Sequence, residues 1–171
     1  MGSFLREFTF GHVRQLDAVA SRFLCGPAEI APLVAGIDTG RALIDIDDSI
    51  IEVHGHGKQG SDYGYSGVRG LNSLITTITA SATAPVIVGQ QLRKGSCGSS
   101  RGAARMIADT LTTVGRMRAA AAIPATTSGN DAEPQPIPLV RADSAFFGYP
   151  AIGAAVSGGA DVSITTGPNS V

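Results

Sequence analysis

The chain has 171 residues, of which 43% are hydrophobic and 16% charged, with 22 Gly and 9 Pro, a composition typical of a globular protein rather than a disordered one. A chain of this length can form a single domain that buries roughly 70% of its unfolded surface, so two domains are not expected. A net charge of −1 excludes a protein whose whole surface is basic and binds nucleic acid.

The first half of the chain predicts one helix and three strands. Residues 9–24 place apolar side chains at helical spacing, and the helix is expected to end at Gly26 and Pro27. Residues 41–53 are β-branched and strand-like, and a glycine-rich stretch over 55–70 predicts a long turn. Two further strands over 71–80 and 85–92 complete an antiparallel meander.

The second half alternates helix and strand. Residues 101–118 form an amphipathic surface helix, and the Ala-, Thr- and Pro-rich residues 119–136 predict an exposed linker. A fourth strand over 137–142, a weaker helix over 146–156 and a fifth strand over 161–165 follow.

This element order, β-β-β-α-β-α-β, is that of a ribonuclease H-like α/β fold. We expect a mixed sheet in which strand 41–53 is central, with 71–80 antiparallel on one side and 137–142 parallel on the other. Residues 1–36 are then expected to form an N-terminal flanking helix, and residues 37–171 one ribonuclease H-like domain.

Three acids on the first strand are the main candidates for chemistry. Strand alternation puts Asp45 and Asp47 on one face and Asp48 on the other. Carboxylates in an apolar strand are costly to desolvate, so the pair indicates a metal or catalytic site. The alternative is that they are solvated acids at a strand end.

Asp143 is the second candidate, because it ends the fourth strand. In a ribonuclease H-like sheet the first and fourth strands are neighbours, so Asp47 and Asp143 can converge. Such carboxylates can hold two Mg²⁺ ions for an in-line displacement at a phosphodiester, with Asp45 nearby as a supporting metal-site residue. The alternative for Asp143 is a cap on the helix near Phe146.

A basic run between positions 93 and 118 favours a polyanionic partner. Its six cations stand against Asp109 alone. A helix with solvated arginines is the alternative explanation. The candidate DNA contacts are Arg93, Lys94, Arg101, Arg105 and Arg141.

Other motifs predict no chemistry. The GxGxxG match over 55–60 is not followed by a helix, so no nucleotide cofactor is expected. His54 and His56 have no further zinc ligand nearby, and Cys97 has no partner base. With only Cys25 besides, no disulfide framework is predicted, and no apolar run is long enough to span a membrane. We expect a cytoplasmic protein that binds no membrane.

Several segments together resemble the DDE transposases of bacterial insertion sequences, in the group 1 branch of the transposase DDE domain. They are IDIDDSI (44–50), KQG (58–60), GYSGVRGLN (64–72), LRKGS (92–96) and VRADSAFF (140–147). The resemblance extends over most of residues 8–165. It implies a ribonuclease H-like core, Mg²⁺ dependence, hydrolysis at the element's ends and strand transfer into target DNA. It also implies that Asp47 and Asp143 are the first two catalytic carboxylates, that the partners are element ends and target DNA, and that a second copy of the chain is a possible partner.

The third carboxylate of that family, a Glu on a later helix, has no counterpart here. The only acid after Asp143 is Asp161. The resemblance therefore implies that residues 37–171 are a partial catalytic domain, from a fragment or decayed copy truncated before the catalytic Glu, with little or no activity. Two alternatives stay open. One is a haloacid dehalogenase-like phosphatase with Asp45 as nucleophile and Asp47 as acid/base. The other is a DNA-binding remnant without turnover.

Overall fold

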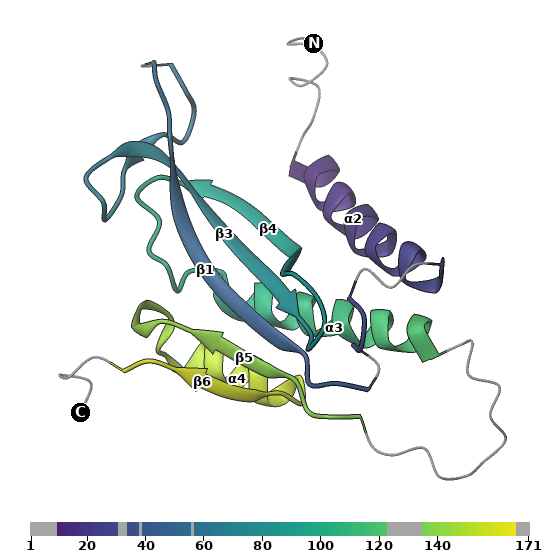
Figure 1. The fold of residues 1–171 in the computed structure, drawn as a ribbon. Coiled ribbons are helices and arrows are strands. Elements are labelled where there is room, and N and C mark those ends of the chain that lie inside the picture. Colours follow the sequence, from purple (N-terminus) through teal and green to yellow (C-terminus); the bar gives the residue numbers. More distant parts are fainter. Residues whose placement is uncertain (1–9, 31–33, 38, 56, 123–134, 167–171) are drawn as a thin grey trace, which may run out of the picture.

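The computed structural model describes residues 10–30, 34–37, 39–55, 57–122 and 135–166, which form a mixed α/β fold (Figure 1). The helices are α2 (Phe10–Ile30), α3 (Ala103–Ala122) and α4 (Tyr149–Ser157). The strands are β1 (Leu43–Glu52), β2 (Asp62–Tyr63), β3 (Arg69–Thr79), β4 (Val86–Lys94), β5 (Leu139–Ala142) and β6 (Asp161–Ile164). None of the helices in these ranges is long and apolar enough to cross a membrane.

Strand β1 lies at the centre of the six-stranded mixed sheet. It pairs antiparallel with β3 along its whole length, from Leu43 opposite Thr79 to Glu52 opposite Gly70. On its other side it pairs parallel with β5, where Asp45 lies beside Arg141. β4 pairs with β3, and β6 with β5, so the order across the sheet is β4-β3-β1-β5-β6, with β2 beside one end of β3. The expected central position of strand 41–53 and its two pairings are confirmed.

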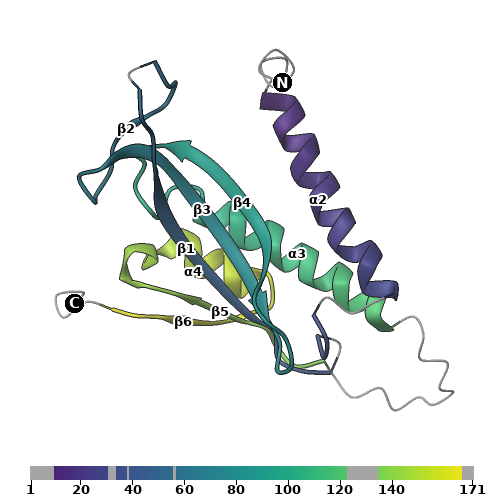
Figure 2. The same cartoon turned by 45° about the horizontal axis from the view of Figure 1, so that its top comes forward.

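Helices α3 and α4 lie against one face of the sheet, and α2 packs beside α3 (Figures 1 and 2). The alternation of β1 follows from this arrangement. Ile44, Ile46 and Asp48 are buried beneath the helices, whereas Asp45 is half-buried and Asp47 exposed on the opposite face. The core joins the sheet to the helices through Ile44, Leu74, Ile78, Val140, Ile107, Val114, Met117 and Phe146.

Two helix boundaries differ from the sequence-based expectation. α2 continues through Gly26 and Pro27 to Ile30, because a proline removes only one backbone donor and a helix can continue past it at a cost. α3 extends to Ala122, because residues 119–122 are four alanines, the strongest helix formers. Residues 119–122 are therefore helix rather than exposed linker, and most of the remaining predicted linker, 123–134, lies outside the described residues.

Two short elements were also not predicted. The glycine-rich stretch includes β2, which pairs Asp62 with Gly70 through a turn at Gly67, whose φ of +71° suits glycine. Phe146 does not begin a helix. It is buried in a 3₁₀ turn over Ser144–Phe146, and α4 starts at Tyr149 with Pro150 in its first turn.

Candidate functional site

The two candidate carboxylates follow the paired residues of β1 and β5. Asp45 lies beside Arg141, so Asp47 and Asp143 are each two residues further along parallel neighbours. Asp143 has an extended backbone, with φ −81° and ψ 179°, so the strand alternation continues past the end of β5. Both residues are exposed, and strand alternation assigns their side chains to the sheet face opposite the helices. The ladder itself ends at Asp45 and Arg141, so a shared site of Asp47 and Asp143 rests on continuing this register by two residues.

Each of these carboxylates is held through one oxygen by a backbone donor. The Asp48 N–H donates to Asp47 Oδ1 at 2.8 Å, and the Ala145 N–H donates to Asp143 Oδ1 at 2.9 Å. The second bond makes Asp143 the cap of the 3₁₀ turn, as its alternative interpretation predicts. Within the described residues, the second oxygen of each carboxylate accepts no hydrogen bond. An open pocket of about 300 Å³ adjoins Asp47, lined by Asp45, Asp47, Asp48, Ser49, Ile75 and Thr77.

Both carboxylate oxygens of Asp45 accept hydrogen bonds from Arg141. Arg141 Nε donates to Asp45 Oδ1 at 2.7 Å and Nη2 to Oδ2 at 2.8 Å. This hydrogen-bonded pair raises the pKa of Arg141. A metal-site role for Asp45 and a DNA contact by Arg141 would each require the pair to open. An Asp45 nucleophile is disfavoured in the same way, and the mixed sheet differs from the parallel sheet of the phosphatases.

Asp48, on the opposite face of β1, is part of a buried polar network. The carboxylate Oδ2 accepts from Asn72 Nδ2 and, at 3.2 Å, from Arg93 Nη2. The Asp48 and Arg93 side chains are 5% and 6% exposed. Arg93 Nε also donates to Asn72 Oδ1 at 2.8 Å. Such a buried ion pair persists because its remaining donors and acceptors are also satisfied, and no buried side-chain N or O atom in the described part of the chain lacks a partner.

The same guanidinium holds the loop between β4 and α3, residues 95–102, which we call the 95–102 loop. Arg93 Nη1 donates to the backbone carbonyls of Gly98 (3.4 Å), Ser99 (3.1 Å) and Arg101. Arg93 was a candidate DNA contact, yet its side chain is buried and every nitrogen is used within the protein. A count of charges along the sequence could not detect this, although an acid on the buried face of β1 signals the need for a buried cation.

The other candidate DNA contacts differ in how they are paired. Lys94 Nζ lies 2.9 Å from Asp62 Oδ2, and hydrogen bonds from Lys94 and Ser96 lower the pKa of Asp62 to about 2. Arg105 Nε lies 2.7 Å from Asp109 Oδ2. Arg101 is exposed and forms no ion pair within the described ranges. The side chains of Lys94, Arg101 and Arg105 are all exposed, so each can contact a phosphate.

Arg118 in the same basic run is a structural residue. It donates to the carbonyls of Ile37 and Pro136, both at 2.9 Å, and of Gly40 at 3.3 Å. Burial lowers its pKa. Arg118 therefore fastens α3 to the segments that precede β1 and β5, and it does not contribute to a phosphate-binding surface.

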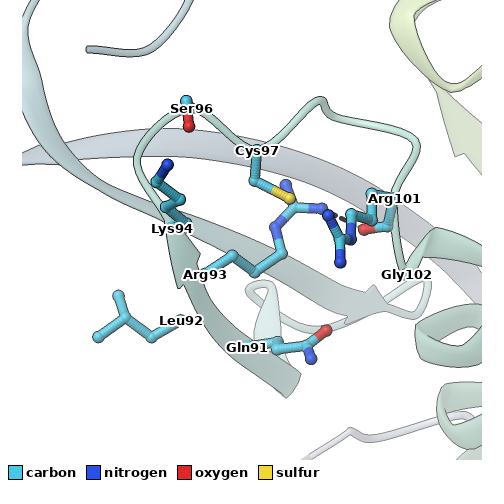
Figure 3. Close-up of a pocket in the computed structure, with 8 residues that line it drawn as sticks. All are labelled: Gln91, Leu92, Arg93, Lys94, Ser96, Cys97, Arg101 and Gly102. Atoms are coloured by element: carbon cyan, nitrogen blue, oxygen red, sulfur yellow. Dashed lines mark hydrogen bonds between the residues drawn. The ribbon is translucent and has the colours of Figure 1, made fainter. Parts of the chain in front are cut away.

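An open pocket of about 540 Å³ lies at the end of β4 against the 95–102 loop (Figure 3). Gly102, with φ +83°, lets the loop turn into α3. The wall of the pocket is rich in cationic and small polar side chains. Its lining residues are Gln91, Leu92, Arg93, Lys94, Ser96, Cys97, Arg101 and Gly102.

The described residues contain no cluster of three or more His, Cys, Asp or Glu side chains that could hold a metal ion. Mg²⁺ is nevertheless often bound by one or two carboxylates with water completing its shell, and Asp47 and Asp143 each keep one oxygen that could serve as such a ligand. His54 is exposed near Glu52, and His56 lies outside the described residues. Cys97 remains a loop thiol.

No protein-family model matches this chain, and no curated protein gives a significant match to it. Its function is therefore inferred from the geometry of the site together with the motif resemblance.

Proposed function

We propose that the chain carries the ribonuclease H-like core of a DDE transposase, with Asp47 and Asp143 as two of its three carboxylates, Mg²⁺ as cofactor and DNA as substrate. The observation that carries the proposal is the parallel register of β1 and β5, in which Asp45 lies beside Arg141. The sheet order β4-β3-β1-β5-β6, antiparallel on one side of β1 and parallel on the other, agrees with this fold.

The chain's own atoms prepare Asp47 and Asp143 for this role. The backbone N–H groups of Asp48 and Ala145 each hydrogen-bond one oxygen of a carboxylate and so restrict its rotation. The other oxygen of each carboxylate stays available to a ligand. A divalent cation bound there supplies activation of an attacking oxygen and neutralisation of charge on the phosphoryl group. The short Asp side chains on neighbouring strands limit rotamer freedom at the site.

The basic pocket supports a polyanionic substrate. β1 and β4 are both antiparallel to β3, so their C-terminal ends point in the same direction, toward the 95–102 loop. Neighbouring strands lie about 4.8 Å apart and rise about 3.3 Å per residue, so Asp47 and Lys94 are separated by roughly 15 Å. This distance corresponds to a few nucleotides along one DNA strand. The exposed ion pairs of Lys94 and Arg105 contribute little to stability, so phosphates can replace their partners.

The missing third carboxylate favours DNA binding without turnover as the second candidate function. No Glu follows Asp143 in these 171 residues. Asp161, the one acid beyond it, forms an ion pair with Arg41, two residues before β1. Two carboxylates hold a second Mg²⁺ poorly, so the chain as given is expected to bind DNA and cleave it slowly or not at all.

Titration with Mn²⁺, followed by water-proton relaxation, tests the metal site. We expect weak binding that is lost in both Asp47→Asn and Asp143→Asn. Asp109→Asn is the matched control, because Asp109 is an exposed acid on α3 paired with Arg105. Equal Mn²⁺ affinity in all four proteins would show that Asp47 and Asp143 do not form the site.

A further inference from the structure

Arg93 is the common partner of two regions, β1 and the 95–102 loop. We propose that Arg93 is a positioning residue, which holds this loop in the conformation that presents Arg101 and Lys94 to a DNA phosphate and ties the loop to β1 through Asp48. The phosphate as ligand rests on the proposed function. The positioning role rests on the contacts alone.

The bonding of Arg93 fits positioning and leaves no donor for a ligand. Nε and Nη2 donate to the side chains of Asn72 and Asp48, while Nη1 faces three loop carbonyls. A planar guanidinium can donate to all of these acceptors at once, because its five N–H groups point outward from three nitrogens. A lysine ammonium has a single nitrogen and cannot reach all of them.

The loop depends on this guanidinium for its inner contacts. At its β4 end the loop is bonded by Gly95 N to Gly60 O at 3.0 Å. Beyond Gly95 its backbone bonds are short-range turns, such as those from Cys97 N to Lys94 O at 2.9 Å and from Arg101 N to Gly98 O at 3.1 Å. The carbonyls of Gly98, Ser99 and Arg101 turn inward to Arg93, and the side chains of Ser96, Cys97 and Arg101 line the pocket (Figure 3). Loss of Arg93 would leave the carbonyls of Ser99 and Arg101 without this donor, and the Gly98 carbonyl with only the turn bond from Arg101 N–H, so the loop would open.

The network also reaches the acidic site. Asp48 binds Arg93 through its side chain and Asp47 through its backbone N–H. A change at Asp48 should therefore disturb the 95–102 loop even though Asp48 lies on the central strand, two strands away from β4.

Arg118 provides a matched control for these effects. It is also a buried arginine that donates to three backbone carbonyls, and it lies at the other end of α3 from the 95–102 loop. Arg118→Lys should reduce stability for the same physical reason as Arg93→Lys without touching the loop.

The alkylation rate of Cys97 reports the state of the loop directly. In a Cys25→Ala background we compare Arg93→Lys, Asp48→Asn and Arg118→Lys under conditions in which circular dichroism shows each to be folded. Each charged hydrogen bond lost favours opening, so Arg93→Lys and Asp48→Asn should react about tenfold faster than the parent. Arg118→Lys should react at the parent rate. If Arg93→Lys fails to fold, Asp48→Asn decides the result. Parent-like rates in Arg93→Lys and Asp48→Asn, or an equal increase in Arg118→Lys, would overturn the positioning role.

Fluorescence anisotropy with a duplex oligonucleotide at low salt tests the ligand. Arg101→Gln, which leaves the network intact, and Arg93→Lys should both weaken binding, whereas Arg118→Lys should not. Absence of DNA binding by the parent protein would overturn the phosphate ligand and the proposed function together. The Cys97 rates would still decide whether Arg93 positions the loop.

Discussion

Asp45 and Arg141 form a bidentate ion pair that joins the central strand to its parallel neighbour, with N–O distances of 2.7 and 2.8 Å. The two residues are partners in the β1–β5 ladder. The pair therefore lies at the last paired position of the two strands, two residues before Asp47 and Asp143, and it neutralises an acid that lines the pocket beside Asp47.

Removal of Arg141 should strengthen metal binding. In Arg141→Gln the Asp45 carboxylate loses its cation and adds negative charge beside Asp47, so Mn²⁺ affinity should rise a few-fold. The cost in stability should be no more than about 1 kcal/mol, because the pair is partly exposed. Mn²⁺ titration and urea unfolding measure the two effects. Arg116→Gln is the control, and weaker Mn²⁺ binding in Arg141→Gln would contradict this account.

The buried Asp48–Arg93 pair should be sensitive to loss of one partner. Arg93→Met leaves an uncompensated carboxylate in the interior, and such changes cost about 3–5 kcal/mol. Arg101→Met, at an exposed position, should change the free energy of unfolding by no more than about 0.5 kcal/mol. Urea denaturation compares them, and similar values for the two variants would be inconsistent with a buried pair.

Lys94 should control the ionisation of Asp62. Hydrogen bonds from Lys94 and Ser96 lower the pKa of Asp62 from 3.8 to about 2. Because the pKa is lower in the folded protein, the pair stabilises the fold above pH 3.8, and this contribution is lost as the pH falls through about 2. In Lys94→Gln, NMR titration should find the Asp62 pKa closer to 3.8. An unchanged pKa would mean that Lys94 is not its cause.

Gly95 should tolerate no side chain. A Cβ there would lie 2.1 Å from the carbonyl oxygen of Gly70 and 2.4 Å from that of Asp62, so backbone would have to move. We expect Gly95→Ala to destabilise the protein by at least about 2 kcal/mol, as overpacked sites do. Gly115→Ala, in α3 with nothing within 4 Å, should stabilise it by about 0.5–1 kcal/mol. Thermal unfolding that ranks the two variants in the opposite order would refute the close approach.

The purified chain should bind DNA weakly and without sequence preference, with affinity that falls steeply as salt rises. It should not nick DNA in Mg²⁺, with or without Asp47→Ala, because the third carboxylate is missing from these residues. Gel assays of supercoiled plasmid measure the nicking. Robust nicking that Asp47→Ala abolishes would show that another group completes the site.

The central strand and its alternation could be predicted from the sequence because both depend on local patterns. β-Branched residues over 41–53 identify the strand, and a period of two separates Asp45 and Asp47 from Asp48. The pairing with 137–142 followed from the element order, which limits the topologies of a mixed sheet.

The roles of the arginines could not be predicted in the same way. Arg93, Arg101 and Arg118 belong to one basic run, yet the first and last are buried in unrelated hydrogen-bond networks and only Arg101 faces solvent. Their burial depends on contacts with residues distant in the sequence, such as Asp48 and Ile37. A local charge count contains no information about those contacts.

The central claim is that Asp47 and Asp143 share one metal site, and paramagnetic NMR tests it most directly. Mn²⁺ added to the ¹⁵N-labelled protein should broaden the amide signals around Asp47 and around Asp143 at the same low concentration. Asp47→Asn or Asp143→Asn should each remove the broadening from both segments. Broadening of one segment alone, or persistence of either after substitution of the other residue, would contradict a shared site.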